Sequence, residues 1–372
     1  MQILEDIITN NPPLYDITEF CPISKALFID IETTGLKKET TSLYLIGCGY
    51  YTNNDFYTKL FFADSEDEEL LILTSFLNFL KDYTHLFHFN GNKFDIPYLQ
   101  YKANKYNLGN IFENLTQVDV YSLIKPLRYL LFPTSMRQKV IEDFLEITRE
   151  DKYNGGELIE VYKRYTKTPC ENDFKDLITH NKEDVIGMHK ILPILSYLSL
   201  KEASLQYESF YINEYCDYQG KTQKEVLFTY RHNCRLPKSF VAKTDTMFVK
   251  VSATDNKVLI RLPIYDTTMK LFFENYKDYY YIPESDCCMI KELCSALPKK
   301  SYVKANRDTC YQKVEATFVK QPCKIFSPSF KTDYKDKASY FRFPEDFSCN
   351  KRDIFGEELL QVFFHLKHSP RN

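Results

Sequence analysis

Short apolar runs separated by turn residues occupy the start of the chain, and they predict strands. Residues 25–32 (KALFIDIE), 42–51 (SLYLIGCGYY) and 56–63 (FYTKLFFA) are rich in β-branched and aromatic side chains, which favour the pleated surface of a sheet. The segment 52–55 (TNND) between the last two runs contains turn-forming residues. Because so short a connection favours a hairpin, we expect the sheet to begin with antiparallel strands.

Apolar residues at helical spacing follow these strands. Leucines recur three and four positions apart within residues 67–83, which is the period of an amphipathic helix. The same criteria predict strands at 84–90 and 117–123 and helices at 94–107, 138–147, 155–165 and 172–198. Antiparallel strands followed by alternating helices and strands are typical of a mixed α/β sheet that is covered by helices.

After residue 200 the pattern changes to short segments that are broken by turns. Residues 246–253, 257–265, 270–276 and 316–323 are β-branched or aromatic, and they predict a mainly β region. A chain of 372 residues has room for about two domains. We therefore expect an irregular N-terminal leader at 1–24, an α/β domain at 25–200 and a smaller, mainly β accessory domain at 201–372.

Composition places the chain among soluble globular proteins. Hydrophobic residues make up 44% of the chain and charged residues 27%, which is enough apolar material for a sizeable core. No apolar run reaches the length of about 18 residues that a transmembrane helix needs. The first residues (MQILEDIITNN) carry acids and lack the basic start of a signal peptide. These features predict a cytoplasmic protein that does not enter a membrane.

The eleven cysteines are expected to be free thiols. Their number is odd, and disulfide frameworks belong mainly to short secreted chains. Cys287 and Cys288 are adjacent, and Cys294 follows six residues later. No two cysteines have the C-x-x-C spacing that is typical of a zinc site, so we expect no structural zinc.

The net charge of −3 conceals an asymmetry between the two halves. Residues 1–199 hold 20 Lys and Arg against 29 Asp and Glu, a net charge of −9. Residues 200–372 hold 28 against 22, a net charge of +6. An acidic half suited to cations and a basic half suited to phosphates favour a nuclease, although modest charge offsets between domains are common.

Two acids of the first predicted strand, Asp30 and Glu32, are the strongest candidates for chemistry. Residues two apart on a strand point to the same face, and these two lie within the apolar run of residues 27–31. Neighbouring buried acids are costly unless a cation compensates them. The pattern therefore favours a metal-binding pair over a solvated strand edge.

Further candidates follow at a strand end and on a long helix. Asp95 begins a helix just after the predicted strand that ends at Asn90, a position where α/β sites gather and where an ordinary helix cap is the alternative. His180 and Asp184 lie four apart and share one helix face. Asp184 would complete a cluster of four carboxylates, and His180 is a candidate proton acceptor. An exposed helix turn with a His–Asp pair is the alternative.

The order of these residues resembles a known superfamily. D-x-E, then N-x-x-x-F-D, then H-x-x-x-D is similar to the three motifs of the DEDD (DnaQ-like) 3′–5′ exonucleases. More narrowly, the chain resembles the YprB-type RNase H-like family over roughly residues 25–200. The segments that carry this resemblance are FIDIETTGL, LYLIGC, FNGNKFDIPYL, EDFLEI, REDKYNGGELIEVY and HNKEDVIGM.

The resemblance implies an RNase H-like fold and a metal-dependent site. Its metal ligands would be Asp30, Glu32, Asp95 and Asp184. In such enzymes two divalent ions, Mg²⁺ or Mn²⁺, lie between the carboxylates, where one activates the attacking water and the other stabilises the leaving oxygen. His180 is carried over as the base or water orienter. Its spacing to Asp184 is similar to the tyrosine subgroup, whereas histidine itself is similar to the other subgroup.

Other polar residues are secondary candidates. Asn90 is expected to fix the backbone before the helix, and Asp119 ends a strand near the expected site or is satisfied there by backbone donors. Lys93, Arg137 and Lys139 are candidates for phosphate contacts. Solvated surface cations are the alternative for these three residues.

The sequence thus predicts a hydrolase that cleaves phosphodiester bonds in nucleic acid. A 3′–5′ exonuclease is the leading hypothesis, and this polarity is implied by the resemblance alone. A structure-specific endonuclease on the same acids is the alternative enzyme. A non-catalytic nucleic-acid-binding protein on the same fold is the alternative of another class, and the presence of all four acids counts against it. The expected partner is DNA or RNA with a free 3′ end.

Overall fold

The structure is a computed structural model that describes residues 1–8, 14–53, 55–132 and 134–365. The chain divides into two units. The first comprises Met1–Arg128 and Phe132–Ser196, and the second comprises Tyr129–Leu131 and Tyr197–Asn372. A mixed α/β first unit and a mainly β second unit confirm the fold class expected from the sequence.

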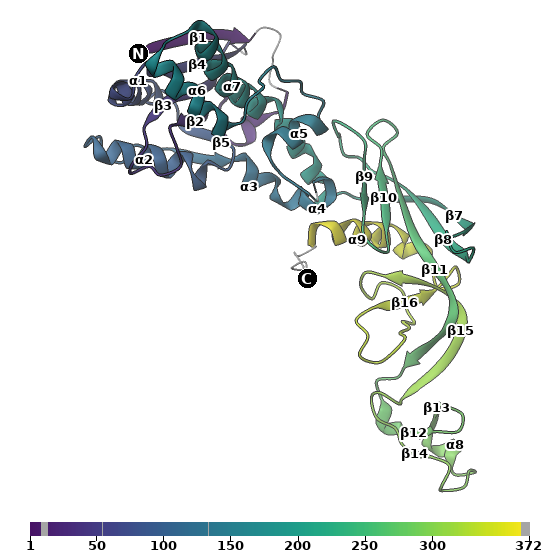
Figure 1. Cartoon of the computed structure of the whole chain (residues 1–372). Coiled ribbons are helices and arrows are strands. Elements are labelled where there is room, and N and C mark those ends of the chain that lie inside the picture. The colour runs from purple at the N-terminus through teal and green to yellow at the C-terminus, as the bar shows by residue number, and fades with distance from the viewer. Residues whose placement is uncertain (9–13, 54, 133, 366–372) are drawn as a thin grey trace. The chain divides into compact units, whose positions relative to one another are not determined.

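A six-stranded mixed sheet forms the centre of the first unit (Figure 1). Across the sheet the strands are β1 (Gln2–Ile8), β4 (Asp55–Phe62), β3 (Leu43–Thr52), β2 (Ala26–Thr33), β5 (His85–His88) and β6 (Thr116–Asp119). The first four are antiparallel neighbours, as the short connection between β3 and β4 predicts. β5 is parallel to β2, and β6 is parallel to β5, so the carboxyl ends of β2, β5 and β6 lie at one edge of the sheet.

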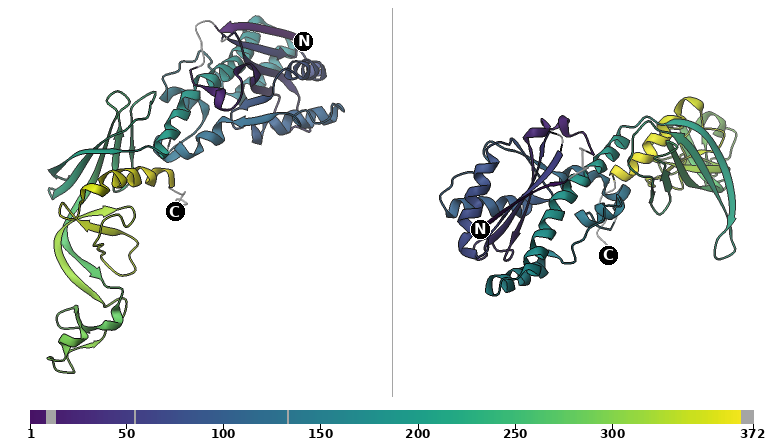
Figure 2. Two further views of the ribbon diagram at one scale, coloured as in Figure 1. Left: turned by 180° about the vertical axis from the view of Figure 1, so that it is seen from behind. Right: turned by 90° about the horizontal axis from the view of Figure 1, so that it is seen from above.

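Helices cover both faces of this sheet, which Figure 2 shows most clearly in its right-hand view. The helices of the first part of the chain are α1 (Glu69–Leu80), α2 (Asp95–Lys105), α3 (Val120–Ile124), α4 (Arg128–Leu131), α5 (Gln138–Phe144), α6 (Gly155–Lys167) and α7 (Glu171–Lys190). α7 packs on β2, β3 and β4 and has α6 beside it, whereas α1 packs on β3 and β4.

The N-terminal segment differs from the expected irregular leader, because β1 forms there and pairs along its whole length with β4. Its four Ile and Leu residues are typical of a strand, but the acids Glu5 and Asp6 interrupt the apolar pattern. Both acids are exposed at the sheet edge, and Glu5 forms an ion pair with Lys59 of β4 at 2.7 Å. The cross-strand pairing, which the sequence pattern does not reveal, decides the structure of this segment.

Two glycines of β3 let α7 approach the sheet closely. A Cβ atom at Gly47 would lie 2.0 Å from the Asn181 side-chain oxygen, and one at Gly49 would lie 2.7 Å from a methyl carbon of Val185. Asn181 and Val185 both belong to α7. Because side-chain atoms cannot pack at such distances, any larger residue at these positions would push the helix away from the β2 carboxylates.

The second unit contains a branched sheet and a small separate sheet. Along the branched sheet lie β16 (Ser339–Arg342), β15 (Tyr311–Gln321), β11 (Lys257–Phe272), β10 (Phe248–Val251) and β9 (Phe240–Lys243), and β8 (Thr222–Arg231) joins β11 to β7 (Gln206–Cys216). The separate sheet consists of β13 (Cys287–Ile290), β12 (Tyr279–Ile282) and β14 (Val303–Lys304). The long β11 pairs with β8 and β10 through its first half and with β15 through its second half.

The helix α9 (Arg352–His365) covers one face of β7 and β8. The Phe355 ring of α9 lies 5.5 Å from that of Phe228, and a Cβ atom at Gly356 would lie 2.5 Å from the Tyr230 ring. Buried residues alternate along the strands and define this inner face, among them Val226, Phe228, Tyr230, Val249, Val251, Val258, Ile260 and Leu262. The intervening residues of the same strands therefore point to the opposite face. The short helix α8 (Lys291–Cys294) packs on the separate sheet.

All eleven cysteines are free thiols, as the sequence predicts. Six of them are exposed or half-buried and five are buried. Three belong to the first unit and eight to the second. Within the residues that the structure describes, no helix combines the length and the apolar character that crossing a membrane requires.

We expect Gly49→Ala to destabilise the first unit by about 1–3 kcal/mol, because the added methyl group would lie 2.5 Å from the Phe56 ring of β4 and 2.7 Å from Val185 of α7. Urea unfolding followed by circular dichroism measures this change. Gly155→Ala is the matched control, since no atom lies within 4 Å of a Cβ there. Equal stability of Gly49→Ala and the wild type would show that Gly49 is not needed for the packing of β3 against Phe56 and α7.

Candidate functional site

Three elements of the first unit bring the four predicted acids together. Asp30 and Glu32 lie two apart on β2, Asp95 is the first residue of α2, and Asp184 lies on α7. The charges of Asp184 and Asp95 act on both carboxylates of β2. These four residues are called the carboxylate cluster below.

Burial and mutual repulsion perturb the two acids of β2. Burial is the largest cause and raises the pKa of Asp30 and of Glu32 well above the ordinary value. The negative charges of Asp184 and then Asp95 add to the rise. Asn181 opposes it at Asp30, because its Nδ2 donates a hydrogen bond of 2.8 Å to Oδ2. Carboxyl groups in such surroundings ionise readily when a cation lies beside them.

Backbone donors hold Asp95 against β2. The N–H groups of Asp95 itself and of Ile31, which lies between the two acids of β2, donate hydrogen bonds to its carboxylate. Burial nevertheless raises the pKa of Asp95 to about 6, and the charge of Asp184 contributes to the rise. Gly91 leaves room for this carboxylate, since a Cβ atom there would lie 3.0 Å from Oδ2.

His180 faces the carboxylate cluster from α7. Its Nε2 lies 3.7 Å from Oε1 of Glu32 and 3.4 Å from Oδ2 of Asp184. One ligand atom from each of these three residues lies within 4.8 Å of the others, which is close enough for them to share one cation. His180 is 5% exposed, so its ring meets this group of acids rather than bulk water.

Asp151 orients the ring of His180. Oδ2 of Asp151 lies 2.7 Å from Nδ1 of the ring. Burial disfavours the ionised form of Asp151, but hydrogen bonds from Lys139 and Arg149 outweigh it and hold the pKa of this carboxyl well below its ordinary value. An ionised Asp151 accepts a hydrogen bond from Nδ1–H, which fixes the ring with Nε2 directed at the carboxylate cluster.

Arg149 is a largely buried cation beside the cluster. Its Nη2 lies 2.6 Å from Oδ1 of Asp184, and its Nε lies 2.9 Å from Oδ1 of Asp151. Its Nη1 lies 3.1 Å from Oε2 of Glu142, a buried acid of α5. Burial acts to lower the pKa of the guanidinium, but these acids raise it above the ordinary value. Arg149 thus compensates one oxygen of Asp184, while Oδ2 of Asp184 faces His180.

Asp119 and Asn90 shape the turn that leads to α2. β6 ends at Asp119 and α3 begins at Val120, so the strand expected at 117–123 is shorter than predicted. Oδ1 of Asp119 accepts a hydrogen bond of 2.8 Å from the N–H of Asn90, and Oδ2 accepts one of 2.7 Å from Ser122. Asn90 has a φ of 59°, in the left-handed region that Asn tolerates better than most residues.

The three predicted phosphate-binding cations lie in different surroundings. Nζ of Lys93 lies 5.9 Å from the ring centre of Tyr121, and the exposed Arg137 directly precedes α5. Nζ of Lys139 lies 2.9 Å from Oδ2 of Asp151. Within the described part of the chain, none of the three forms an ion pair with the carboxylate cluster. Lys139 instead supports the carboxylate that orients His180, which the sequence did not indicate.

Sequence reasoning missed three residues that the structure places at the site. Arg149 and Asp151 belong to a charged stretch (REDK) that is typical of an exposed loop. The loop folds onto α7 because Glu183 accepts hydrogen bonds from the backbone N–H groups of Glu150 and Asp151 at 2.7 and 2.8 Å. Asn181 directly follows His180 in the helix motif. Its side chain is fully buried against the sheet, and the sequence alone does not show that this face of the helix is buried.

The chemistry of the cluster fits hard divalent cations. Carboxylate oxygens are the ligands that Mg²⁺ and Mn²⁺ prefer. Four carboxylates converge, and Arg149 pairs with only one of them among the described residues. Burial first, and then like charge, raise the pKa values of Asp30, Glu32 and Asp95, so a bound cation would favour their ionised forms.

Comparison with known families agrees with this geometry. Residues 27–196 match the family profile RNase_H_2, which belongs to the RNase_H superfamily. The matched segment includes the four acids of the carboxylate cluster and His180. The first unit therefore has an RNase H-like fold, as the sequence predicts. No curated protein matches the chain.

Solved structures show only distant likeness. A family B DNA polymerase from the archaeon Pyrobaculum calidifontis is 19% identical, with a TM-score of 0.38, over 49% of this chain and 26% of the polymerase. A product-bound exonuclease I is 13% identical, with a TM-score of 0.28, over 62% of this chain and 59% of that one. A zinc-bound complex of E. coli ExoI with single-stranded DNA is 11% identical, with a TM-score of 0.28, over 93% and 74%. The chain thus spans less than two thirds of the first two proteins.

We expect Asp95→Asn to reduce the pH dependence of stability in the metal-free protein. The folded state raises the pKa of Asp95 to about 6, whereas an unfolded Asp titrates near about 3.9. The folded state therefore holds the extra proton, and stability falls as pH rises through this window. The free energy of unfolding, measured with urea in EDTA, should be lower at about pH 7.5 than at about pH 5. Asp95→Asn should reduce this difference by on the order of 1 kcal/mol.

Asp67→Asn is the matched control, because Asp67 is exposed ahead of α1. It should leave the decline unchanged. Mg²⁺ should reduce the decline in the wild type, since a bound cation favours ionised carboxylates in the folded state. The same pH dependence in Asp95→Asn and in the wild type would contradict the burial of an uncompensated carboxyl at this position.

Proposed function

We propose that the first unit is a metal-dependent nuclease that hydrolyses phosphodiester bonds from a 3′ end by a two-metal-ion mechanism. The observation that carries this proposal is the convergence of four carboxylates from β2, α2 and α7 on an RNase H-like fold. The order of their motifs, which resembles the DEDD exonucleases of the YprB type, supports the 3′–5′ polarity. DNA or RNA with a free 3′ end is the proposed substrate.

The residues of the site have two proposed roles, metal binding and proton transfer. The proposed ligands of two Mg²⁺ or Mn²⁺ ions are Asp30, Glu32, Asp95 and Asp184. When bound, such ions supply positive charge that activates an attacking water and stabilises the leaving oxygen. His180 would accept the proton of that water at Nε2, because Asp151 holds its Nδ1 proton. Arg149 would keep Asp184 ionised and in place.

One contact favours a second candidate, a nucleic-acid-binding protein that does not cleave. Arg149 already neutralises part of the charge of Asp184, at 2.6 Å, and so weakens its attraction for a cation. Two features favour the nuclease instead. Oδ2 of Asp184 faces His180 rather than Arg149, and Asp30 and Glu32 have no arginine or lysine partner among the described residues.

Digestion of end-labelled single strands tests the nuclease proposal. DNA and RNA oligonucleotides carrying either a 5′ or a 3′ label are incubated with the full chain and Mn²⁺. A 3′ exonuclease should produce a ladder from the 5′ label and release mononucleotides at once from the 3′ label. The comparison of DNA with RNA then identifies the preferred sugar.

Asp30→Asn is the control for this digestion. We expect it to lower the rate by at least about 100-fold, because the cluster loses a charge that holds the cations, while the folded state is retained since relieving repulsion among buried acids rarely destabilises. Internal fragments in place of a ladder would indicate an endonuclease. Wild-type rates in Asp30→Asn would contradict the assignment of the site.

A further inference from the structure

The sheet of the second unit has an open face. α9 covers the face that carries Phe228 and Tyr230. On the opposite face of β8 and β11, the apolar side chains of Leu227 and Leu259 are half-buried, and Arg261 is exposed. An antiparallel sheet that exposes one face in this way commonly presents it to solvent or to a partner.

Aromatic side chains stand on this open face. On β7, Tyr211 is 65% exposed and Tyr215 is 45% exposed, and both pair across the strand with positions of β8 that point to the open face. Phe248 of β10 is half-buried beneath the guanidinium of Arg261, whose Cζ lies 4.6 Å from the ring centre. Exposed rings on a sheet offer flat surfaces on which unpaired bases stack.

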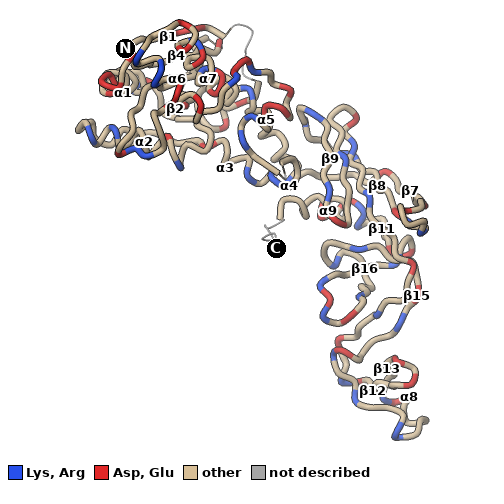
Figure 3. The backbone as a smooth tube through the Cα atoms, in the orientation of Figure 1, with Lys and Arg blue, Asp and Glu red and all other residues tan. Residues whose placement is uncertain are grey.

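Cations are interleaved with these rings, and basic positions recur along β8, β9 and β11 in Figure 3. Lys243 of β9 and Lys250 of β10 are exposed, and neither has an acidic partner within the described residues. Arg231 and Lys257 share Glu208 as a partner, at 2.6 and 3.9 Å. Lysine side chains without an acidic partner in the protein can bind the phosphates of a nucleic acid.

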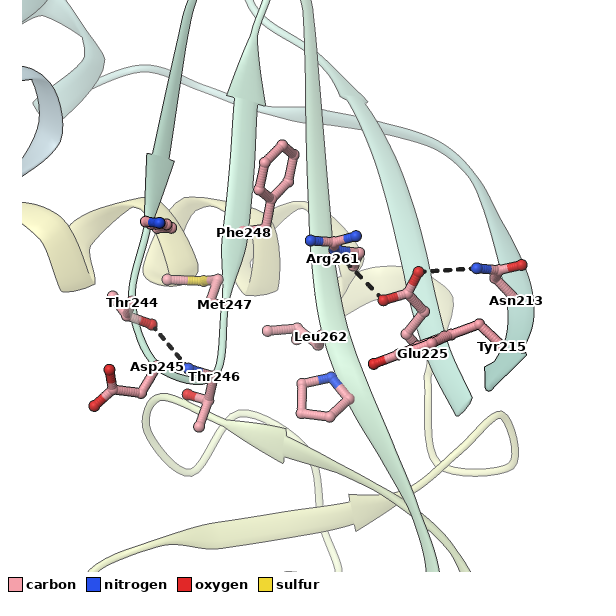
Figure 4. A pocket seen from close by; sticks show the side chains of 12 residues that line it. Asn213, Tyr215, Glu225, Thr244, Asp245, Thr246, Met247, Phe248, Arg261 and Leu262 are labelled. Atoms are coloured by element: carbon pink, nitrogen blue, oxygen red, sulfur yellow. Dashed lines mark hydrogen bonds and ion pairs between the residues drawn. The ribbon is translucent and has the colours of Figure 1, made fainter. Parts of the chain in front are cut away.

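A hollow of about 520 Å³ lies in this part of the sheet (Figure 4). The turn between β9 and β10 forms one side of the hollow, and Tyr215 of β7 lies on the other, with Arg261 between them. Glu225 is the buried acid of the lining; it forms an ion pair with Nε of Arg261 at 3.4 Å and accepts a hydrogen bond of 3.0 Å from Nδ2 of Asn213. Asp245 is exposed on the turn and is the one other acid that lines the hollow.

We propose that the open face of β7–β11 binds single-stranded nucleic acid. Lys243 and Lys250 contact phosphates, and Tyr211 and Tyr215 stack on bases. This inference rests on the proposed function, because it names the form of nucleic acid that the chain holds. A duplex fits the face poorly, since its bases are already stacked on each other and hide the surfaces that the tyrosines would contact.

Fluorescence anisotropy with the full chain tests this proposal. The Asp30→Asn variant is titrated in EDTA, to prevent cleavage, into labelled oligothymidylate and oligouridylate over a range of salt concentrations. Adding Tyr211→Ala and Tyr215→Ala should weaken binding at least about fivefold, because each ring stacks on a base. Adding Lys243→Ala and Lys250→Ala instead should reduce the slope of log affinity against log salt by about 1.4, the contribution of two phosphates on a single strand.

Lys337→Ala is the matched control, since Lys337 is an exposed lysine in the loop before β16. It should change neither affinity nor slope. Unchanged binding in the tyrosine variant and an unchanged slope in the lysine variant would overturn the proposal, as would tighter binding of a duplex than of the single strands. The proposal would also fail if neither oligonucleotide bound, and an acidic protein partner would then be indicated.

Cleavage of a labelled trinucleotide with Mn²⁺ separates this proposal from the proposed function. The wild type and Lys337→Ala should cleave it at equal rates, because both retain the carboxylate cluster. If the lysine and tyrosine variants lose binding of long strands while the wild type cleaves nothing, the open face is supported and the nuclease fails. If the wild type cleaves and the variants bind normally, the nuclease stands and the open face is overturned.

Discussion

Repulsion among four carboxylates is the constraint on which the first unit depends. Asp30 and Glu32 share one face of a buried strand, and α2 and α7 add Asp95 and Asp184 to the same place. Burial and like charge raise the pKa values of three of these groups. This repulsion lowers the stability of the metal-free fold. Such a loss of stability is common at functional sites.

The surrounding structure limits this repulsion without removing it. Three of the four carboxylates have a source of compensation: an amide of α7 at Asp30, backbone N–H groups at Asp95 and the guanidinium of Arg149 at Asp184. At Glu32, burial and like charge act unopposed. The glycines of β3 let α7 come close to the sheet, where Asn181 and His180 reach the acids of β2. The close helix packing therefore also determines the electrostatics of the site, because a helix held further away would leave these acids without both partners. The residual negative charge is what suits the cluster to divalent cations.

Part of this site could be predicted from the sequence, and the reason for the rest is physical. Strand periodicity placed Asp30 and Glu32 on one face, and the order of the motifs, through the resemblance to the DEDD exonucleases, joined Asp95 and Asp184 to them. Arg149 and Asp151 act through a loop whose burial depends on Glu183, a contact between segments that no local pattern reveals. The same holds for β1, which forms because β4 is there to pair with it, and for the open face of the second unit, which needs the placement of α9 to be recognised.

The two units would meet one polyanion by different means, the first through cations held by carboxylates and the second through lysines and exposed rings. The proposed function depends on divalent ions in the carboxylate cluster, and isothermal titration calorimetry of the metal-free chain with Mn²⁺ measures their binding. We expect about two ions per chain, with protons released on binding because the pKa values of Asp30, Glu32 and Asp95 are raised in the metal-free protein. No saturable binding of Mn²⁺, or binding without any release of protons, would show that the cluster does not hold these ions.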